Sequence, residues 1–244
     1  MQKITQGLTN YSYVENNTFV QEKHKNQFNH NIDYAILSVL NFVPKLILNT
    51  PEKTKWELIE GEEPKLTKDN IEKISDCLKT LHNSNLAFPK FNIKDRIREY
   101  LKILAQKGIK IPKIDAYYKR INKILTNMKK DTPCHNDLWT QNMVLKNDKL
   151  YIVDWEYATM GDKHFDLAYF IESSHLTDEQ ETILLDRYDD YIYEYILQQK
   201  ILVNYLVVLW VNAQPKKYFD DAPYIKNLDK YHQEILLRRK KKED

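Results

Sequence analysis

Residues 133–156 read PCHNDLWTQNMVLKNDKLYIVDWE. The two apolar, β-favouring runs in this stretch, 143–145 and 150–153, are separated by four polar residues. Asn147 and Asp148 lie at the centre of this separator, where both side chains suit a tight two-residue turn. The stretch therefore predicts a β-hairpin, and the hairpin determines which of the flanking polar side chains can meet.

The register of this hairpin gathers polar side chains at its open end. Asn142 should face Val153, one residue before Asp154. Because cross-strand neighbours lie about 5 Å apart, the Asn142 amide oxygen and the Asp154 carboxylate can reach one common cation. A hard ion such as Mg²⁺ takes oxygen ligands and is usually held by one or two protein groups together with substrate phosphates. His135 and Asp137 directly precede the first strand, so they belong to the same end.

The spacing HxDxxxxN gives these side chains chemical roles. Asp137 stands five residues before Asn142, as in the kinase pattern that places a carboxylate beside the substrate hydroxyl and an amide beside Mg²⁺. We expect Asp137 to accept the hydroxyl proton and His135 to support the catalytic loop. Asn142 and Asp154 should hold Mg²⁺, with Glu156 as a second-metal ligand or an outer carboxylate. A core histidine and a turn-capping aspartate would explain a lone HxD, but not the full eight-residue match.

Three motifs, HNDLWTQN (135–142), VDWEYA (153–158) and GDKHFDLAYF (161–170), resemble the choline/ethanolamine kinase and aminoglycoside phosphotransferase superfamily. Within it, the chain is most similar to bacterial choline kinases of the LicA type. The resemblance implies an α+β, two-lobed protein-kinase-like fold. A small β-rich N-lobe at 1–61 would carry the nucleotide-binding side and the hinge, and a larger, mainly helical C-lobe at 62–244 would carry the catalytic hairpin. The implied reaction is ATP- and Mg²⁺-dependent phosphorylation of the hydroxyl of choline.

The predicted secondary structure fits this division. Strand-like pieces at 11–14 and 18–21 flank a hairpin turn, helical spacing follows at 32–42, and a further strand at 55–59 ends at Glu60-Gly61. From Thr67, which should cap a helix ending near residue 82, amphipathic patterns dominate. The later helices are expected at 96–106, 117–128, 178–197, 201–213 and 224–239.

The resemblance also assigns the nucleotide contacts. QGLTNYSYV (6–14) is similar to a glycine-containing phosphate loop, although an ordinary turn explains this stretch nearly as well. WELIEG (56–61) looks like the hinge segment whose backbone groups bind adenine, with an edge strand and turn as the alternative. The residues implied by these two segments are Gly7, Thr9, Asn10, Leu58, Ile59 and Glu60.

A kinase also needs a basic side chain on its third strand, usually oriented by an acid on the following helix. Lys23 is the nearest candidate for the base and Asp33 for the acid. Gln21 is an alternative occupant of the usual basic position, and Lys25 is a further possible base. This departure from the family pattern leaves the phosphate contact open.

The acceptor pocket should open beside Asp137. A quaternary ammonium donates no hydrogen bond, so aromatic faces and a nearby carboxylate recognise it best. The resemblance implies that Tyr157, Glu172 and Trp210 bind the acceptor, while Asp166 braces the catalytic segment. Choline kinases often carry a second tryptophan three residues before Trp210, where this chain has a valine. A kinase for ethanolamine, another amino alcohol or an aminoglycoside therefore remains an alternative.

Other classes of protein account for the same residues less well. A metal-dependent hydrolase is a remote alternative that would use His135, Asp137, Asp154, His164 and Asp166, without the histidine-rich spacing typical of such sites. A catalytically inactive binding module is opposed by the intact pattern of acids and amide.

Composition narrows the partners and the compartment. With 37 basic and 35 acidic residues, the net charge of +2 gives no reason to expect nucleic-acid binding. The basic run at 238–242 reads as a solvated helix end. The apolar run 201–211 is too short to span a bilayer, so we expect no stable membrane association. Cys77 and Cys134 suggest no disulfide framework, which favours the cytoplasm, where ATP is available. The oligomeric state stays open.

Overall fold

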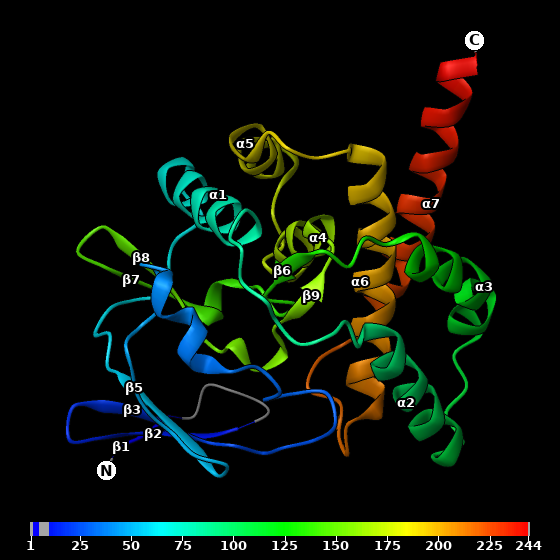
Figure 1. Ribbon diagram of the computed structural model, residues 1–244. Coiled ribbons are helices and arrows are strands. Elements are labelled where there is room, and N and C mark those ends of the chain that lie inside the picture. Colours follow the sequence, from blue (N-terminus) through cyan, green and yellow to red (C-terminus); the bar gives the residue numbers. More distant parts are fainter. Residues whose placement is uncertain (1, 5–9, 244) are drawn as a thin grey trace.

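The computed structural model describes residues 2–4 and 10–243 and consists of two lobes (Figure 1). The smaller lobe is an antiparallel five-stranded sheet with strand order β1-β2-β3-β5-β4. Between β3 and β4 the chain forms a 3-10 helix, η1 (Tyr34–Val39). The strands of this lobe are β1 (Gln2–Ile4), β2 (Tyr11–Glu15), β3 (Thr18–Glu22), β4 (Leu46–Asn49) and β5 (Lys53–Glu57).

The β2-β3 hairpin forms where the sequence predicts it. Glu15 pairs with Thr18 across a two-residue turn, in which Asn16 and Asn17 have φ values of 48° and 56°. Asparagine tolerates this left-handed backbone better than most residues, and two such residues produce the turn that matches strand twist. The hairpin directs Val20 into the core, where its side chain is fully buried.

The larger lobe is mainly helical, as predicted. Thr67 caps its first helix, because the Thr67 hydroxyl accepts a hydrogen bond from the Asn70 amide. Figure 1 shows α6 running through the middle of this lobe, with α2, α3, α4 and α7 around it. The helices are α1 (Lys68–His82), α2 (Ile93–Gln106), α3 (Pro112–Asn127), α4 (Lys163–Ser173), α5 (Asp178–Tyr188), α6 (Tyr193–Ala213) and α7 (Ala222–Glu243).

Helix α6 is long and apolar enough to cross a membrane, and no other helix among the described residues meets both conditions. However, 78% of its most apolar window is buried inside the protein. Leu202, Val203, Tyr205 and Val208 are all fully buried against neighbouring helices. The apolar run therefore forms the core of the larger lobe.

Several element boundaries differ from the predictions. The helix expected at 178–197 is broken after Tyr188, because Asp189 adopts a φ of 68°, and α6 then continues without a gap into the next predicted helix. The helix expected at 32–42 is only the shorter 3-10 helix η1. Helix α4 was not predicted, because it is buried on several sides and lacks a clear amphipathic pattern. Four of its own side chains are fully buried: Phe165, Leu167, Ala168 and Phe170.

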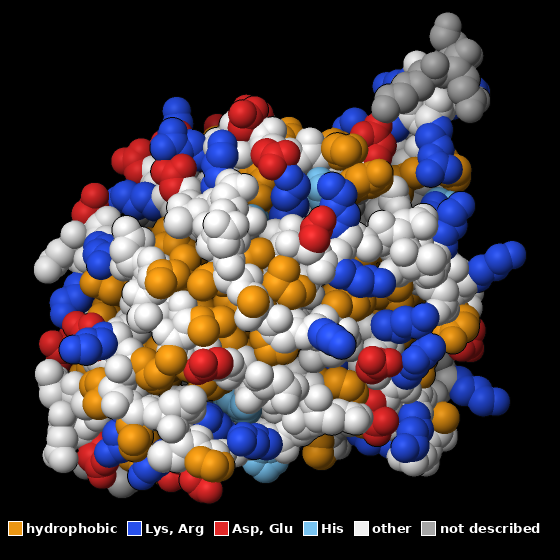
Figure 2. Space-filling view, in the orientation of Figure 1, with side chains coloured by type: hydrophobic (Ala, Val, Ile, Leu, Met, Phe, Trp, Pro, Cys, Tyr) orange, Lys and Arg blue, Asp and Glu red, His pale blue; other side chains and the backbone are white. Residues whose placement is uncertain are grey.

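Two small strand pairs complete the larger lobe. Strand β6 (Thr132–Cys134) pairs with β9 (Thr159–Gly161), and β7 (Met143–Lys146) pairs with β8 (Lys149–Ile152). The β7-β8 hairpin has the predicted register and the predicted turn, in which Asn147 and Asp148 both have positive φ. On the face shown in Figure 2, Lys and Arg side chains are interspersed with Asp and Glu side chains over most of the surface.

The chain crosses from the sheet to the helical lobe close beside this hairpin. Glu62 and Leu145 exchange two backbone hydrogen bonds of 3.1 and 2.8 Å. At the preceding position, a Cβ on Gly61 would lie 2.4 Å from the Leu145 carbonyl oxygen. Glycine is therefore required here for the close approach of two backbones, within the segment that contains the expected lobe boundary.

Replacing Gly61 with alanine should destabilise the protein. The added methyl group forces backbone atoms apart, which typically costs about 1–3 kcal/mol. For a chain of this size each kcal/mol lowers the unfolding midpoint by about 2–4 °C, so calorimetry should record a drop of about 5 °C. Glu60→Ala, one residue earlier at an exposed position, is the matched control and should change the midpoint little. An unchanged midpoint in Gly61→Ala would refute the close-approach argument.

Candidate active site

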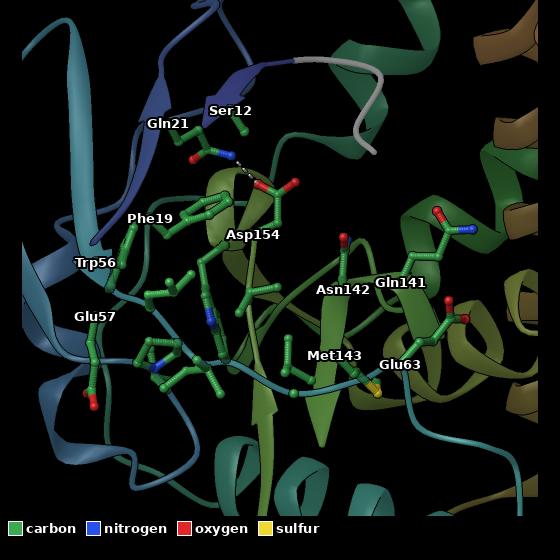
Figure 3. Close-up of a pocket in the computed structure, with 18 of the residues that line it drawn as sticks. Ser12, Phe19, Gln21, Trp56, Glu57, Glu63, Gln141, Asn142, Met143 and Asp154 are labelled. Atoms are coloured by element: carbon green, nitrogen blue, oxygen red, sulfur yellow. Dashed lines mark hydrogen bonds between the residues drawn. The ribbon is translucent and has the colours of Figure 1, made fainter. Parts of the chain in front are cut away.

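The open end of the β7-β8 hairpin lies at the boundary of two cavities. The Val153 amide donates to the Asn142 carbonyl over 2.9 Å, which continues the hairpin pairing by one residue. Asp154 follows in a left-handed conformation with φ 61° and ψ 57°. Asn142 and Asp154 line both cavities. In Figure 3 their side chains point to the same side of the hairpin and into the same space.

Asp137 is held in place on both sides. The Tyr169 hydroxyl donates to Asp137 Oδ1 over 2.6 Å. The Asn142 amide nitrogen donates to the Asp137 carbonyl over 2.8 Å and approaches Asp137 Oδ2 at 3.4 Å. Burial raises the pKa of the Asp137 carboxyl above its usual value, while the Tyr169 hydrogen bond opposes the rise. Since the Asn142 nitrogen faces Asp137, its amide oxygen is left for a cation.

Asp154 lies among other carboxylates. Burial, followed by the charges of Glu156 and Asp137, raises the pKa of the Asp154 carboxyl well above its usual value. The Gln21 amide nitrogen donates to Asp154 Oδ1 over 3.1 Å and partly offsets this rise (Figure 3). A divalent cation would relieve the repulsion, and hard oxygen donors are the ligands that Mg²⁺ prefers. Asn142 and Asp154 therefore fit a magnesium ion.

Glu156 links the catalytic segment to the smaller lobe. Its Oε2 accepts hydrogen bonds from the side-chain amides of Asn10 and Asn29 over 3.0 and 2.8 Å, and lies 2.9 Å from His30 Nε2. The His30 amide also donates to the Glu156 carbonyl over 2.7 Å. Glu156 does not line either cavity. This placement fits an outer carboxylate better than a second-metal ligand.

Asp166 supports the loop that carries Asp137, the expected catalytic residue. Its two carboxylate oxygens accept from the backbone amides of His135 and Asn136, each over 2.7 Å. His82 lies 3.2 Å away on the other side of the carboxylate. The His135 ring meets the Val153 carbonyl over 2.9 Å and thereby joins the loop to the hairpin. The loop before Asp137 is thus held by Asp166 and by the Val153 carbonyl, and His82 in turn contacts the Asp166 carboxylate.

The first cavity, of about 520 Å³, lies between the lobes. Among the residues predicted to bind nucleotide, Asn10, Leu58 and Ile59 line it, whereas Glu60 does not. Gly7 and Thr9 lie outside the described residues. Residues that line the cavity but were not predicted from the sequence include Ser12, Phe19, Tyr34, Trp56, Trp139 and Met143.

The expected pair of Lys23 and Asp33 does not form. The Lys23 ammonium donates to Asn49 Oδ1 and to the Thr50 carbonyl, each over 2.6 Å, and does not line the cavity. Asp33 instead caps η1 by accepting from the Ala35 amide over 3.1 Å. The strand position that faces Asp154 belongs to Gln21, the alternative noted from the sequence. Lys23 lies past the end of β3, where strand geometry no longer directs its side chain to the cavity.

The second cavity, of about 440 Å³, adjoins the first beside Asp137. Tyr157 and Trp210 both line it, but Glu172 does not. The Glu172 carboxylate is buried and accepts from the Tyr231 hydroxyl over 2.6 Å and from the Asn204 amide over 2.7 Å. Glu172, expected at the acceptor, therefore lies outside this cavity in the structure, and its oxygens accept hydrogen bonds inside the helical core. The other wall residues include Arg96, Trp139, Tyr169, Phe219, Asp220 and Tyr224.

The residues considered for a hydrolase do not converge on one point. The ring of His164 bonds to Asp162 Oδ1 over 2.7 Å and to the Ile192 amide over 3.0 Å, away from both cavities. A buried group of His82, Cys134 and Asp166 has metal-like spacing. The Asp166 oxygens, however, already accept backbone hydrogen bonds, and burial raises the pKa of the Cys134 thiol, which disfavours the thiolate.

Tyr169 was missed from the sequence although a signal exists. It stands three residues after Asp166 on α4, and residues so spaced share one helix face. Arg96 carried no comparable signal, since one arginine in an amphipathic helix usually points to solvent. Both residues line the cavity beside Asp137 because tertiary packing brings α2 and α4 to it.

Replacing Tyr169 with phenylalanine should lower kcat about 10–100-fold, because a hydrogen bond to a charged group contributes about 1.5–3 kcal/mol. The hydrogen bond lowers the pKa of Asp137, so its loss should raise that pKa and move the acidic limb of the pH–rate profile to higher pH. Tyr205→Phe is the matched control, since the buried Tyr205 hydroxyl has no partner among the described residues. Equal kcat in both variants would exclude this role.

Fold and site together define the class of protein: a two-lobed, kinase-like phosphotransferase in which Asp137 and the pair of Asn142 and Asp154 line adjoining cavities. The chain belongs to the phosphotransferase enzyme family, whose sequence pattern matches residues 43–195. A LicA homologue from Mycoplasma capricolum subsp. capricolum is 47% identical over 234 residues, which cover 96% of this chain and 95% of that protein.

Solved structures confirm the fold. The choline kinase LicA from Streptococcus pneumoniae superposes with a TM-score of 0.71 at 22% identity, covering 97% of this chain and 91% of that one. A choline/ethanolamine kinase family protein from Mesorhizobium loti superposes with a TM-score of 0.74 at 20% identity, covering 93% and 85%.

Proposed function

We propose that this protein transfers the γ-phosphate of ATP, with Mg²⁺, to the hydroxyl of choline. One observation carries the proposal: the aromatic rings of Tyr157 and Trp210 and the carboxylate of Asp137 line one cavity that adjoins the cavity between the lobes. Aromatic faces suit a quaternary ammonium, and a carboxylate suits a hydroxyl that must lose its proton. The similar structures that bear the name choline kinase support the same acceptor.

The chain's own residues divide the work between the cavities. Leu58 and Ile59 line the wall where the adenine would lie, and a similar LicA structure holds AMP. Asn142 and Asp154 would hold Mg²⁺, which when bound neutralises phosphate charge. Asp137 orients the acceptor hydroxyl and accepts its proton. The positions of these groups supply most of the rate enhancement, because phosphoryl transfer depends mainly on alignment and charge neutralisation.

Choline is favoured over other acceptors by the character of the second cavity. Its wall carries more aromatic rings than carboxylates, whereas several ammonium groups of an aminoglycoside would need several acids. Solved aminoglycoside phosphotransferases share the fold, so kanamycin is a necessary competitor in any test. A cytoplasmic location, where ATP is abundant, agrees with this reaction.

The test is coupled ATP turnover with Mg²⁺ across choline, ethanolamine and kanamycin. We expect the highest kcat/KM for choline and no turnover without a divalent cation. Trp210→Ala should raise the choline KM about 10–30-fold, because a desolvated cation–π contact contributes about 2 kcal/mol. Tyr118→Ala, at an exposed position on α3, is the control for loss of an aromatic ring. Preference for kanamycin, or phosphate release without ATP, would contradict the proposal.

A further inference from the structure

The nucleotide cavity is short of positive charge. Its described lining residues include Glu57, Glu62, Glu63 and Asp154 but no lysine or arginine. At the strand position where kinases usually place a base, Gln21 supplies only a neutral amide, which already donates to Asp154. Transfer of a phosphoryl group needs cationic groups near its oxygens, so a cation other than a strand lysine should serve this reaction.

Arg96 is the cation that the second cavity supplies. It extends from the first turn of α2, is only 4% exposed, and lines that cavity together with Asp137, Asn142 and Asp154. Its buried Nε and Nη1 atoms have no hydrogen-bond partner among the described residues. Buried charged donors are almost always satisfied, because leaving them unpaired is costly. The unpaired guanidinium therefore points to an anionic ligand.

The surroundings of Arg96 fix its orientation and keep it charged. The guanidinium stacks over the ring of Tyr157 with its central carbon 4.2 Å from the ring centroid. Burial alone would lower the pKa of Arg96, but Tyr100, Tyr157, Tyr169 and Asp137 outweigh it and raise that pKa. The planar guanidinium is thus oriented by Tyr157 within the cavity that Asp137 also lines, an arrangement that suits recognition of tetrahedral oxyanions.

We propose that Arg96 binds the phosphoryl group while it passes from ATP to the acceptor, and that it is a catalytic residue of the reaction proposed above. The acceptor oxygen forms a bond to the γ-phosphorus as the bond to the β,γ-bridging oxygen breaks. The bonding electrons leave with ADP, and the hydroxyl proton passes to Asp137. Arg96 donates hydrogen bonds to the equatorial oxygens of the transferring group and afterwards to the phosphate of the product.

This role also determines how choline lies in the cavity. One face of Tyr157 is already covered by the guanidinium, so that face is closed to a second cation. The quaternary ammonium therefore lies toward Trp210, which stacks on Phe219 with centroids 6.2 Å apart, and its hydroxyl points to Asp137. Two like charges are kept at opposite ends of one cavity, and the end beside Arg96 receives the phosphate.

The experiment compares Arg96→Gln and Arg96→Lys with Arg98→Gln, an exposed arginine on the same helix. Removal of an arginine that binds the transferring group lowers kcat about 10³-fold or more, and we expect that loss for Arg96→Gln with the choline KM within about threefold of wild type. Calorimetric titration should give a phosphocholine Kd at least about tenfold weaker, with the choline Kd unchanged, because only the product carries the phosphate. Arg96→Lys should recover part of the kcat, since lysine keeps the positive charge but lacks the planar set of N–H donors of the guanidinium.

Two results would overturn this role. A kcat within about threefold of wild type in Arg96→Gln excludes binding in the transition state. A change confined to the choline KM, with kcat unaltered, limits Arg96 to acceptor binding and excludes it from binding the transferring phosphoryl group. If Arg96→Gln does not fold, Arg96→Lys decides: a lowered kcat with an unchanged choline KM supports the role, and a kcat within about threefold of wild type contradicts it. If the wild type phosphorylates no amino alcohol, the proposed function fails separately, and binding of inorganic phosphate to wild type but not to Arg96→Gln still tests the residue.

Discussion

Replacing Asp137 with asparagine should lower kcat for choline phosphorylation about 10³-fold, the usual scale for loss of a positioned proton acceptor. Asparagine has nearly the same shape and can still accept from the Tyr169 hydroxyl, but it cannot accept the proton of the acceptor hydroxyl. The choline KM should change little, because the proposed pose puts the ammonium end of choline near Trp210, at the far side of the cavity from Asp137. Coupled assays of ATP turnover over a range of choline concentrations measure both kcat and the choline KM.

Asp131→Asn provides the control for this variant. Asp131 is exposed in the segment before β6 and lines neither cavity. Replacing it with asparagine alters the net charge by the same amount as Asp137→Asn. Its kcat should match that of the wild type. An Asp137→Asn enzyme with wild-type kcat would show that the acceptor hydroxyl loses its proton elsewhere, and would remove Asp137 from the chemistry.

Replacing Asp154 with asparagine should be comparably severe, with kcat reduced about 10²–10³-fold or more. The variant keeps a side-chain oxygen but loses the negative charge that attracts the divalent cation, so half-maximal activity should need more Mg²⁺. Activity measured as a function of Mg²⁺ concentration separates this effect from simple loss of catalysis. Asp148→Asn, at the exposed turn of the same hairpin, should leave the Mg²⁺ dependence unchanged.

The thermal stability of Asp154→Asn distinguishes loss of cation binding from damage to the fold. Without metal, Asp154 is a carboxylate whose charged form is disfavoured by burial and by Glu156 and Asp137. Removing that charge relieves the repulsion, so Asp154→Asn should unfold in metal-free buffer at the same temperature as wild type or higher. A markedly lower midpoint together with the loss of kcat would attribute the effect to misfolding and contradict a role in binding the cation.

The parts of the fold that were predicted correctly depend on neighbours in the chain. The β7-β8 hairpin needs only its two apolar runs and the Asn147-Asp148 turn, and α1 needs its Thr67 cap and amphipathic spacing. Helix α4 was missed because packing on every side removes the polar face that periodicity relies on. The break at Asp189 was missed because the positive φ there lies between two stretches with helical spacing, and an aspartate alone does not mark the end of a helix.

The same distinction separates the site residues. Asp137, Asn142 and Asp154 come together through a hairpin a few residues long, so their spacing was informative. The environment of Glu172 is decided by Tyr231, 59 residues away, which no local pattern records. Arg96 reaches the catalytic cavity through the packing of α2, so its position in a helical pattern gave no indication of its role.

The most direct test of the site is the binding of a divalent cation to its two proposed ligands. Mn²⁺ can replace Mg²⁺ and is detected by electron paramagnetic resonance in a complex with the protein and a non-hydrolysable ATP analogue. A cation held by Asn142 and Asp154 predicts tight binding to the wild-type complex, and binding at least about tenfold weaker in Asp154→Asn and in Asn142→Leu. Unchanged Mn²⁺ binding in both variants would contradict a metal site at the end of this hairpin.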